Sequence, residues 1–304
     1  MNAAAGVSLE LRAGGRALPL GKGPLLMGVV NASPDSFSDG GWRSTVDEQV
    51  ALARALVAAG ATILDVGGES GVTNSPPVAP EMEIERLAPL IERIADELDV
   101  VVSVDTYKPA VAQAAIAAGA TMVNDVSGLR DPAVAEVCGR GGAALVIVHT
   151  RAEPKVKLLD PGWDRRVVQD VHAFLAERMT LAEAQGVPRE RMVLDPGPDL
   201  GKTPEQTVEV LRDLASFHAL DRPLLLAVSR KDFVGVITGR PPAERGAGTL
   251  AALAHGLDAG AHILRVHDVG AAADFIAVRA VLRGGADLPA GARLADALRR
   301  EPAR

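Results

Sequence analysis

Polar and charged residues follow nearly every short apolar run of this sequence, and their side chains are of types that do chemistry. These residues are Asn31, Asp65, Asp105, Asn124 with Asp125, His149, Asp195, Ser229-Arg230-Lys231, and Arg265 with His267. A single Asp, Asn or Ser at such a position is ordinary, because these residues cap the helix that follows. A polar residue after almost every run is harder to explain by capping, so the set predicts a common site.

The residue types in this set suit two kinds of ligand. Asp105, Asn124 and Asp195 offer acceptors for a flat heterocycle that carries an amino group and a ring N–H. Lys231 can donate a hydrogen bond to an oxo group or a ring nitrogen on the other side of such a heterocycle. Arg265 and His267 lie two residues apart, so on a strand both side chains point to the same face. As a cationic pair they fit a phosphate or pyrophosphate.

The sequence offers little for a metal centre of the histidine and cysteine type. Cys138 is the only cysteine, and the histidine spacings form no metal cluster. Asn31 is a candidate ligand for Mg²⁺, which prefers oxygen and takes much of its coordination from substrate phosphates. We therefore expect Mg²⁺ as the cofactor, with Asn31 as its ligand from the protein.

Eight apolar runs after Pro24 alternate with stretches of helical spacing and predict parallel strands joined by helices. The predicted strands are Leu25–Val30, Ile63–Val66, Val100–Val104, Met122–Val123, Ala144–Val148, Met192–Leu194, Leu224–Val228 and Ile263–Val266, and the helical stretches include Val46–Ala59, Pro80–Leu98, Arg166–Gln185, Pro204–Phe217 and Ala243–Ala259. Eight such units predict an α/β protein folded as a (β/α)₈ TIM barrel. An open doubly wound sheet is the alternative, but no G-x-G-x-x-G follows the first run. In a barrel the polar residues would converge on one rim, at the carboxyl ends of the strands.

The N-terminal residues predict an additional β-hairpin. Residues Val7–Arg12 alternate apolar and polar side chains, Gly14-Gly15 forms a turn, and Arg16–Leu20 follows. We expect this hairpin to cover the bottom of the core. The chain of 304 residues fits one domain over residues 1–304, with the barrel core at about 24–283.

Charge and hydrophobicity exclude several classes of protein. The formal net charge is −7 and no long basic run is present, which argues against binding to nucleic acid. No apolar run reaches about 18 residues and no signal pattern follows Met1, so we expect no membrane segment. The composition predicts a soluble, cytoplasmic protein.

From Leu26 to about Arg283 the chain resembles the dihydropteroate synthase family. The matching segments are Met27-Gly-Val-Val-Asn-Ala-Ser-Pro-Asp-Ser-Phe-Ser-Asp-Gly-Gly41, Asp65-Val-Gly-Gly-Glu-Ser70, Ser103-Val-Asp-Thr106, Asn124-Asp125, Asp195-Pro-Gly197 with Gly201-Lys202, Ser229-Arg-Lys231 and Arg265-Val-His-Asp268. The resemblance implies a transferase of folate biosynthesis, in which 4-aminobenzoate displaces pyrophosphate from the methylene of a dihydropterin pyrophosphate. It also implies a homodimer.

The resemblance assigns roles to the predicted site residues. Asp105, Asn124, Asp195 and Lys231 would hold the pterin, while Asn31, Arg265 and His267 would hold the pyrophosphate, with Mg²⁺ near Asn31. Catalysis would rest on Lys231, Arg265 and His267, which stabilise the departing charge while the amine is aligned. The segment Asn31–Gly41 would be a mobile loop that closes over the site.

Two departures from the family pattern leave other functions open. The family continues Thr-Arg-Pro-Gly after Glu69-Ser70, whereas this chain has Gly71-Val-Thr-Asn-Ser-Pro-Pro77, without the arginine. Pro198-Asp-Leu200 stands where the family often has an aromatic residue. The alternatives are a pterin-binding paralogue that has lost synthase activity or uses another amine, and a methyl-transfer barrel that presents a reduced folate to a corrinoid protein.

Overall fold

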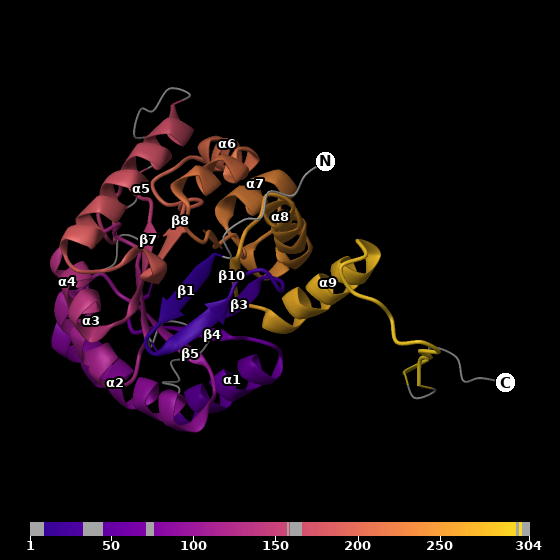
Figure 1. Ribbon diagram of the computed structural model, residues 1–304, viewed down its shortest axis with the longest axis horizontal. Helices are drawn as coiled ribbons and strands as arrows, with labels where there is room; N and C mark the ends of the chain where they lie inside the picture. Colours follow the sequence, from indigo (N-terminus) through magenta and orange to yellow (C-terminus); the bar gives the residue numbers. More distant parts are fainter. Residues whose placement is uncertain are drawn as a thin grey trace.

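Eight parallel strands form the centre of the molecule, and helices surround them in a ring (Figure 1). The computed structural model describes residues 9–32, 45–70, 76–156, 158, 166–295 and 298–299. The strands of the ring are β3 (Leu25–Asn31), β4 (Ile63–Gly67), β5 (Val101–Asp105), β6 (Met122–Asp125), β7 (Ala144–Val148), β8 (Met192–Asp195), β9 (Leu225–Leu226) and β10 (Ile263–Val266). The helices are α1 (Val46–Ala58), α2 (Pro80–Glu97), α3 (Pro109–Ala117), α4 (Ala133–Gly141), α5 (Val167–Ala184), α6 (Pro204–Arg212), α7 (Asp232–Thr238), α8 (Gly246–Asp258) and α9 (Val269–Leu282).

The order of the strands closes the sheet into a barrel. The sheet runs β8-β7-β6-β5-β4-β3-β10-β9, and every neighbouring pair is parallel. A parallel bridge between Leu194 of β8 and Leu224, just before β9, joins the two ends of this order. The (β/α)₈ TIM barrel predicted from the sequence is therefore confirmed.

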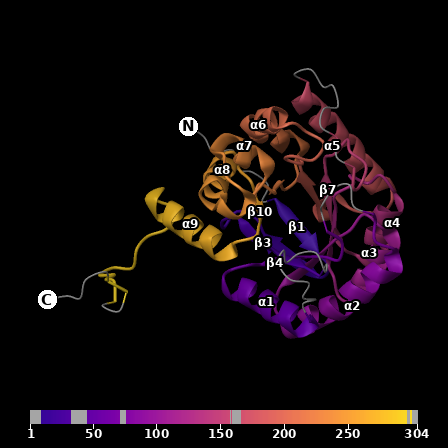
Figure 2. The same cartoon turned by 180° about the vertical axis from the view of Figure 1, so that it is seen from behind.

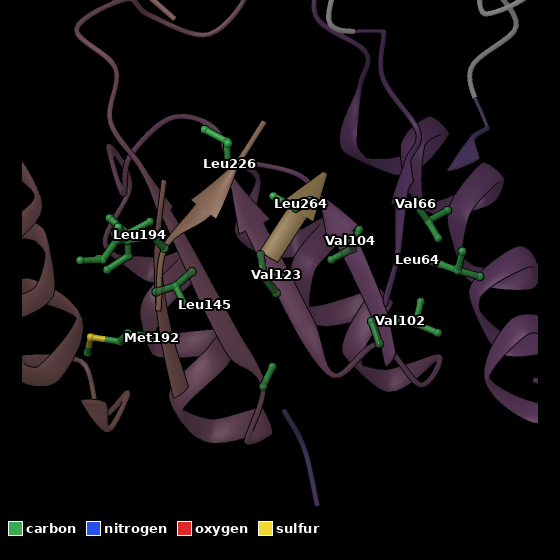
Figure 3. Packing of buried hydrophobic residues seen from close by; sticks show 14 of the residues in the cluster. Leu64, Val66, Val102, Val104, Val123, Leu145, Met192, Leu194, Leu226 and Leu264 are labelled. Carbon is green, nitrogen blue, oxygen red and sulfur yellow. The ribbon is translucent and has the colours of Figure 1, made fainter. Parts of the chain in front are cut away.

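Alternation along the strands sorts their side chains into two layers, as expected for a period of two. The outward side chains, among them Leu64, Val102 and Leu145, pack in one large cluster against the helices (Figure 3). The inward side chains, among them Met27 and Ile63, form a second cluster inside the barrel. Aliphatic residues fill both layers, which explains how a chain with 3% aromatic residues packs a core of this size.

The predicted N-terminal hairpin is confirmed as β1 (Glu10–Ala13) and β2 (Arg16–Pro19), which pair antiparallel. Leu11 and Ala13 are fully buried in the inner cluster, and β1 lies across the middle of the ring in Figure 1. Arg222 donates hydrogen bonds to Met192 O of the barrel and to Glu10 O of the hairpin. The hairpin thus plugs the end of the barrel opposite to the carboxyl ends of its strands.

The structure differs from the sequence prediction in the last third of the barrel. Strand β9 has two residues, where Leu224–Val228 was expected. The helix predicted over Pro204–Phe217 ends at Arg212, and a 3₁₀ helix, η2 (Leu214–Leu220), follows. This change of pitch lets Phe217 pack, fully buried, on the ring of His172 at a centroid distance of 4.5 Å. Among the described residues, no helix is both long and apolar enough to cross a bilayer.

Candidate active site at the carboxyl end of the barrel

A layer of polar side chains lies directly above the aliphatic filling of the barrel. It arises because the inward-facing positions of five strands change from apolar to polar within one or two steps of the alternation. The successive inward residues are Ile63 and Asp65 on β4; Val101, Ser103 and Asp105 on β5; Met122 and Asn124 on β6; Val193 and Asp195 on β8; and Ile263 and Arg265 on β10. The predicted convergence of the strand ends on one rim is thus visible in the register of the strands.

Asp65 is the centre of the hydrogen-bond network in this layer. Its fully buried carboxylate accepts hydrogen bonds from Ser103 Oγ (2.7 Å), Asn124 Nδ2 (3.0 Å) and Arg265 Nε (2.7 Å). Ser103 lies beside Asp65 in the β4–β5 register, so the first contact follows from the pairing of the strands. A buried carboxylate with three donors is well compensated, and it fixes the orientation of each donor.

Arg265 bridges two carboxylates from different strands. Its Nε binds Asp65 and its Nη2 binds Asp105 Oδ2 at 2.9 Å. Burial, followed by repulsion from Asp65, raises the pKa of Asp105 to about 7, although Arg265 acts in the opposite direction. Asp105 therefore exchanges a proton near neutral pH, and one edge of the site can present either a carboxylate or a carboxylic acid.

Asn124 leaves one strong acceptor unused. Because its Nδ2 donates to Asp65, the assignment of its two amide atoms is fixed, and Oδ1 faces away from that carboxylate. Oδ1 is buried and has no hydrogen-bond partner among the described residues. Native structures rarely leave a buried acceptor unpaired, so this atom is suited to a ligand N–H.

Asp195 and Lys231 face each other across the point where the barrel closes. Asp195 ends β8, is 4% exposed, and accepts a hydrogen bond from Gly197 N at 2.7 Å. Burial raises the pKa of Asp195, against this hydrogen bond and the charge of Lys231. Burial lowers the pKa of Lys231, against the charges of Asp199 and Asp195. Within the described ranges the Lys231 ammonium makes no hydrogen bond or ion pair, so it stays available to a ligand oxygen or nitrogen.

Asp199 is a site residue that the sequence patterns did not predict. It has a φ of 60°, and its Oδ2 accepts a hydrogen bond from Phe233 N (3.1 Å) in the first turn of α7. Its Oδ1 is buried without a partner among the described residues. Asp199 therefore connects the loop after β8 to the start of α7, directly behind Lys231, which caps that helix.

His267 lies at the outer edge of the rim, whereas Arg265 lies inside the mouth of the barrel. The imidazole Nδ1 is 3.0 Å from Ser229 Oγ. Desolvation, followed by the charges of Arg265, Arg230 and Lys231, lowers the pKa of His267 to about 4. At neutral pH the predicted pair is therefore a guanidinium beside a neutral imidazole, which can still donate a hydrogen bond to an anion.

Asn31 ends β3 next to Gly67 of β4. A Cβ atom at Gly67 would make ordinary van der Waals contacts of 3.7 Å with Asn31 Oδ1 and with Asp105 Cβ, so Gly67 lies between these two side chains. Among the described residues, no group of three or more His, Cys, Asp or Glu side chains is arranged to hold a metal ion. A single amide oxygen fits only a metal that takes most of its ligands from a bound phosphate.

Two predictions fall on residues outside the described ranges. Most of the segment Asn31–Gly41 belongs to residues 33–44, and residues 71–75 contain most of the altered stretch Gly71–Pro77. The closing motion expected of the first and the contacts expected of the second stay predictions.

The site contains residues that single strand endings did not reveal. Asp65 was recognised as a polar strand end, but its role as the centre of the network depends on three other strands. Ser103 could have been found from the alternation, because it occupies an inward position between Val101 and Asp105. Asp199 has no signal in the sequence, since its position depends on the conformation of a loop.

Comparison with known proteins agrees with this geometry. The model of the family described as pterin binding enzymes matches residues 27–267. The dihydropteroate synthase of Escherichia coli K12 is 38% identical over 261 residues, which cover 86% of this chain and 92% of the relative. That of Bacillus subtilis 168 is 40% identical over 246 residues, covering 81% and 84% of the two chains.

Solved structures give the same result at the level of the fold. The dihydropteroate synthase of Xanthomonas albilineans with 4-aminobenzoic acid superposes with a TM-score of 0.82 at 40% identity, over 91% of this chain and 99% of that one. The same enzyme in complex with 7,8-dihydropteroate gives a TM-score of 0.81, over 90% and 98% of the two chains.

Proposed function

The chain belongs to the dihydropteroate synthase family of pterin-binding enzymes, which are transferases, and we propose how its rim residues divide the two parts of the substrate between them. The pterin lies between Asp105, Asn124, Asp195 and Lys231. The pyrophosphate lies toward Asn31, Arg265 and His267. The arylamine approaches from the solvent side, and 4-aminobenzoate is the proposed amine.

The unpaired Oδ1 of Asn124 is the observation that carries the pterin assignment. It is a buried acceptor inside a polar layer, and it needs an N–H donor that the described part of the chain does not supply. Asp195 and Asp105 supply carboxyl oxygens beside it, and Lys231 supplies an ammonium that has no partner among the described residues. A pterin matches this set, since one edge carries amino and ring N–H donors and the other carries an oxo acceptor.

The reaction follows from the separation of the two groups of residues. The arylamine nitrogen attacks the methylene carbon of the dihydropterin, and the C–N bond forms as the C–O bond to pyrophosphate breaks. The electron pair of that bond leaves with the pyrophosphate oxygen, and the amine releases one proton to solvent. Arg265 and His267 stabilise the charge that develops on the leaving oxygen, and the pterin contacts keep the methylene aligned with the amine.

Mg²⁺ is the proposed cofactor, with Asn31 as its ligand from this chain. When bound, the ion would neutralise charge on the pyrophosphate. The amide oxygen of Asn31 at the carboxyl end of β3 supports this assignment.

Pyrophosphate release with purified protein tests the function. We expect release only when the dihydropterin pyrophosphate and 4-aminobenzoate are both present, together with Mg²⁺. Omission of either organic substrate is the control for hydrolysis. A protein that binds the dihydropterin but releases no pyrophosphate above background with 4-aminobenzoate would overturn the assignment as a synthase, and would favour the paralogue with another amine.

Replacement of His267 with alanine is expected to lower kcat/KM for the dihydropterin pyrophosphate on the order of 100-fold, the cost of losing one donor to a developing anion. Affinity for the pyrophosphate-free 6-hydroxymethyl-7,8-dihydropterin should stay unchanged, because His267 lies at the rim, outside the pterin contacts. Steady-state pyrophosphate release and calorimetric titration measure the two quantities. His218→Ala, at the opposite end of the barrel near His262, is the matched control. Equal losses in both quantities would contradict the assignment of His267 to the pyrophosphate.

The outer face of α6, α7 and α8 is the proposed surface for a homodimer. These helices lie side by side in Figures 1 and 2 and border an apolar groove of about 330 Å³ that includes Leu211, Phe233 and Ala252. Val236 and Ile237 beside it are each 69% exposed. A second copy can insert these side chains in a two-fold arrangement, in which both partners present the same patch.

We expect Ile237→Asp to convert the dimer to a monomer, because the dimer would bury the new carboxylate in an apolar contact. Sedimentation velocity at micromolar concentration measures the change. Leu52→Asp, a partly exposed leucine of α1, is the control. A wild-type chain that sediments as a monomer would exclude the proposed interface.

The cytoplasmic location expected from the sequence stays a prediction. Cell fractionation followed by immunodetection would test it.

A further inference from the structure

The loop that carries Asp195 closes around the ammonium of one of its own lysines. This loop, residues 195–203, joins β8 to α6 and contains Lys202, which is 5% exposed. Lys202 Nζ donates to Gly197 O at 2.9 Å and to Leu200 O at 3.3 Å, and it lies 2.7 Å from His149 Nδ1. With a longer contact to His149 O at 3.5 Å, three carbonyl oxygens and an imidazole nitrogen converge on this amino group, whose pKa burial lowers to about 7 against the charge of Asp195.

The imidazole of His149 has a defined tautomer in this arrangement. Its Nε2 is 3.1 Å from Asp170 Oδ2, and an ionised carboxylate only accepts hydrogen bonds. The proton of the neutral ring is therefore on Nε2, and Nδ1 presents a lone pair to Lys202. Burial, together with the charge of Lys202, lowers the pKa of His149 to about 4 and keeps the ring neutral.

Asp170 anchors the other end of this chain of contacts. It lies in the first turn of α5 and also accepts a hydrogen bond from Arg151 Nε at 2.9 Å. Desolvation acts against the charge of Asp170, but the hydrogen bonds from His149 and Arg151 keep the pKa of this carboxyl below its usual range. A continuous series of contacts thus connects α5, the end of β7 and the loop after β8.

The same loop is pressed against the end of β7. Gly197 has a φ of 66°, and a Cβ atom at this position would lie 1.9 Å from His149 O. Gly197 N donates to Asp195 Oδ1, and His149 N donates to Asp195 O at 2.8 Å. The backbone that holds the Asp195 carboxylate therefore also supplies a carbonyl to the Lys202 ammonium.

Convergent carbonyl dipoles repel each other unless a cation lies between them. Small loops of this kind often use a bound metal ion for that purpose, with oxygen ligands from the backbone. Here the group that the carbonyl oxygens contact is covalently part of the chain. Its charge also lies close enough to Asp195 to oppose the effect of burial on that carboxyl.

We propose that Lys202, held by His149 and Asp170, is a positioning residue that fixes the Asp195 carboxylate for the pterin and thereby sets the affinity for that half of the substrate. The proposal rests on the proposed function, because it takes Asp195 as a pterin ligand. Lys202 acts through Asp195 and the loop, and it does not touch the reacting atoms.

The test replaces Lys202 with alanine, which leaves a space that a small cation can enter. In Lys202→Ala we expect the Kd for 6-hydroxymethyl-7,8-dihydropterin, and the KM for its pyrophosphate, to rise about 10- to 100-fold, as when a partner that orients a ligand-binding group is removed. We expect kcat to change less than about 3-fold, since the transition-state contacts of Arg265 and His267 remain. Ammonium chloride should restore the pterin affinity, whereas tetramethylammonium chloride at equal ionic strength should not.

Lys108→Ala is the matched control. Lys108 is also a largely buried lysine that holds a loop, through Val78 O at 2.7 Å and Glu83 at 2.6 Å, but it lies in a different part of the rim. Ammonium should not change pterin affinity in this variant. Unchanged pterin affinity in a folded Lys202→Ala, or a loss of kcat without a change in KM, would overturn the proposal.

A second measurement requires no variant to fold. The ¹⁵N chemical shifts of His149 in the wild-type enzyme at neutral pH should report a protonated Nε2 and an unprotonated Nδ1. A doubly protonated ring or the opposite tautomer would overturn the proposal. These outcomes separate this proposal from the proposed function. A wild-type chain that fails to bind the dihydropterin refutes the function. A wild-type chain that binds it, while Lys202→Ala binds it equally well, refutes only the role of Lys202.

Discussion

Replacement of Arg265 with methionine is expected to lower the free energy of unfolding by about 3–5 kcal/mol at neutral pH, the usual cost of removing one partner from a buried ion pair. Arg265 binds both Asp65 and Asp105, and Asp65 is fully buried. Without the guanidinium, two carboxylates face each other in the mouth of the barrel with too little compensation. Urea unfolding followed by circular dichroism measures the loss. Synthase activity should disappear as well, because the leaving pyrophosphate loses its principal cation.

The loss of stability in Arg265→Met should depend on pH in a defined direction. The pKa of Asp105 is already raised to about 7, chiefly by burial and by Asp65. A carboxyl whose pKa is higher in the folded than in the unfolded state makes the fold more stable as the pH falls through the folded pKa. Removal of Arg265 raises that pKa further, so the variant should regain part of its stability between about pH 8 and about pH 6.

Arg279→Met is the control for Arg265→Met. It removes an ion pair with the half-exposed Asp258 on the outside of the barrel, and such pairs contribute about 0–1 kcal/mol. A loss of similar size in both variants, or a loss in Arg265→Met that is the same at both pH values, would contradict the buried network as described.

Replacement of Asp195 with asparagine is expected to weaken the binding of 6-hydroxymethyl-7,8-dihydropterin by about 1–3 kcal/mol, the difference between a charged and a neutral acceptor in a buried site. That range corresponds to about 5- to 150-fold in Kd. The fold should persist, because an asparagine Oδ1 can still accept the hydrogen bond from Gly197 N. Isothermal titration calorimetry measures the affinity, and thermal unfolding checks the fold.

Asp221→Asn is the matched control for Asp195→Asn. Asp221 is exposed, and its φ of 54° is tolerated by asparagine as well as by aspartate. It precedes β9 and therefore lies at the end of the barrel opposite to the site. Unchanged pterin affinity in Asp195→Asn would remove this residue from the proposed pocket.

The sequence predicted the barrel well because its strands obey a simple alternation. Each apolar run is followed by a helix, and a polar residue stands where the inward face reaches the rim. Strand β9 was predicted too long because Ala227 and Val228 are as apolar as the residues that do pair. The early end of α6 depends on the packing of Phe217 against His172, a contact between elements 45 residues apart in the chain that no local pattern contains.

The sequence predicted which residues form the candidate site better than it predicted how these residues contact one another. Asp105, Asn124, Asp195 and Arg265 all lie in the polar layer where the strand ends placed them. The sequence did not reveal that Arg265 is bound by two carboxylates or that His267 is neutral, because both facts depend on neighbours from other strands. The role of Lys202 depends on a loop that folds back onto β7. In the sequence alone, this residue looks like an ordinary surface lysine.

The single bridge between Leu194 and Leu224 makes the junction between β8 and β9 a weakly paired part of the barrel. Asp195 ends β8 on one side of this junction, and Lys231 follows β9 on the other side. A pterin bound by both residues would therefore bridge the junction between β8 and β9. It would stabilise this junction more than the fully paired strands β4 and β5. The substrate would therefore contribute to the closure of the barrel as well as to the chemistry at its rim.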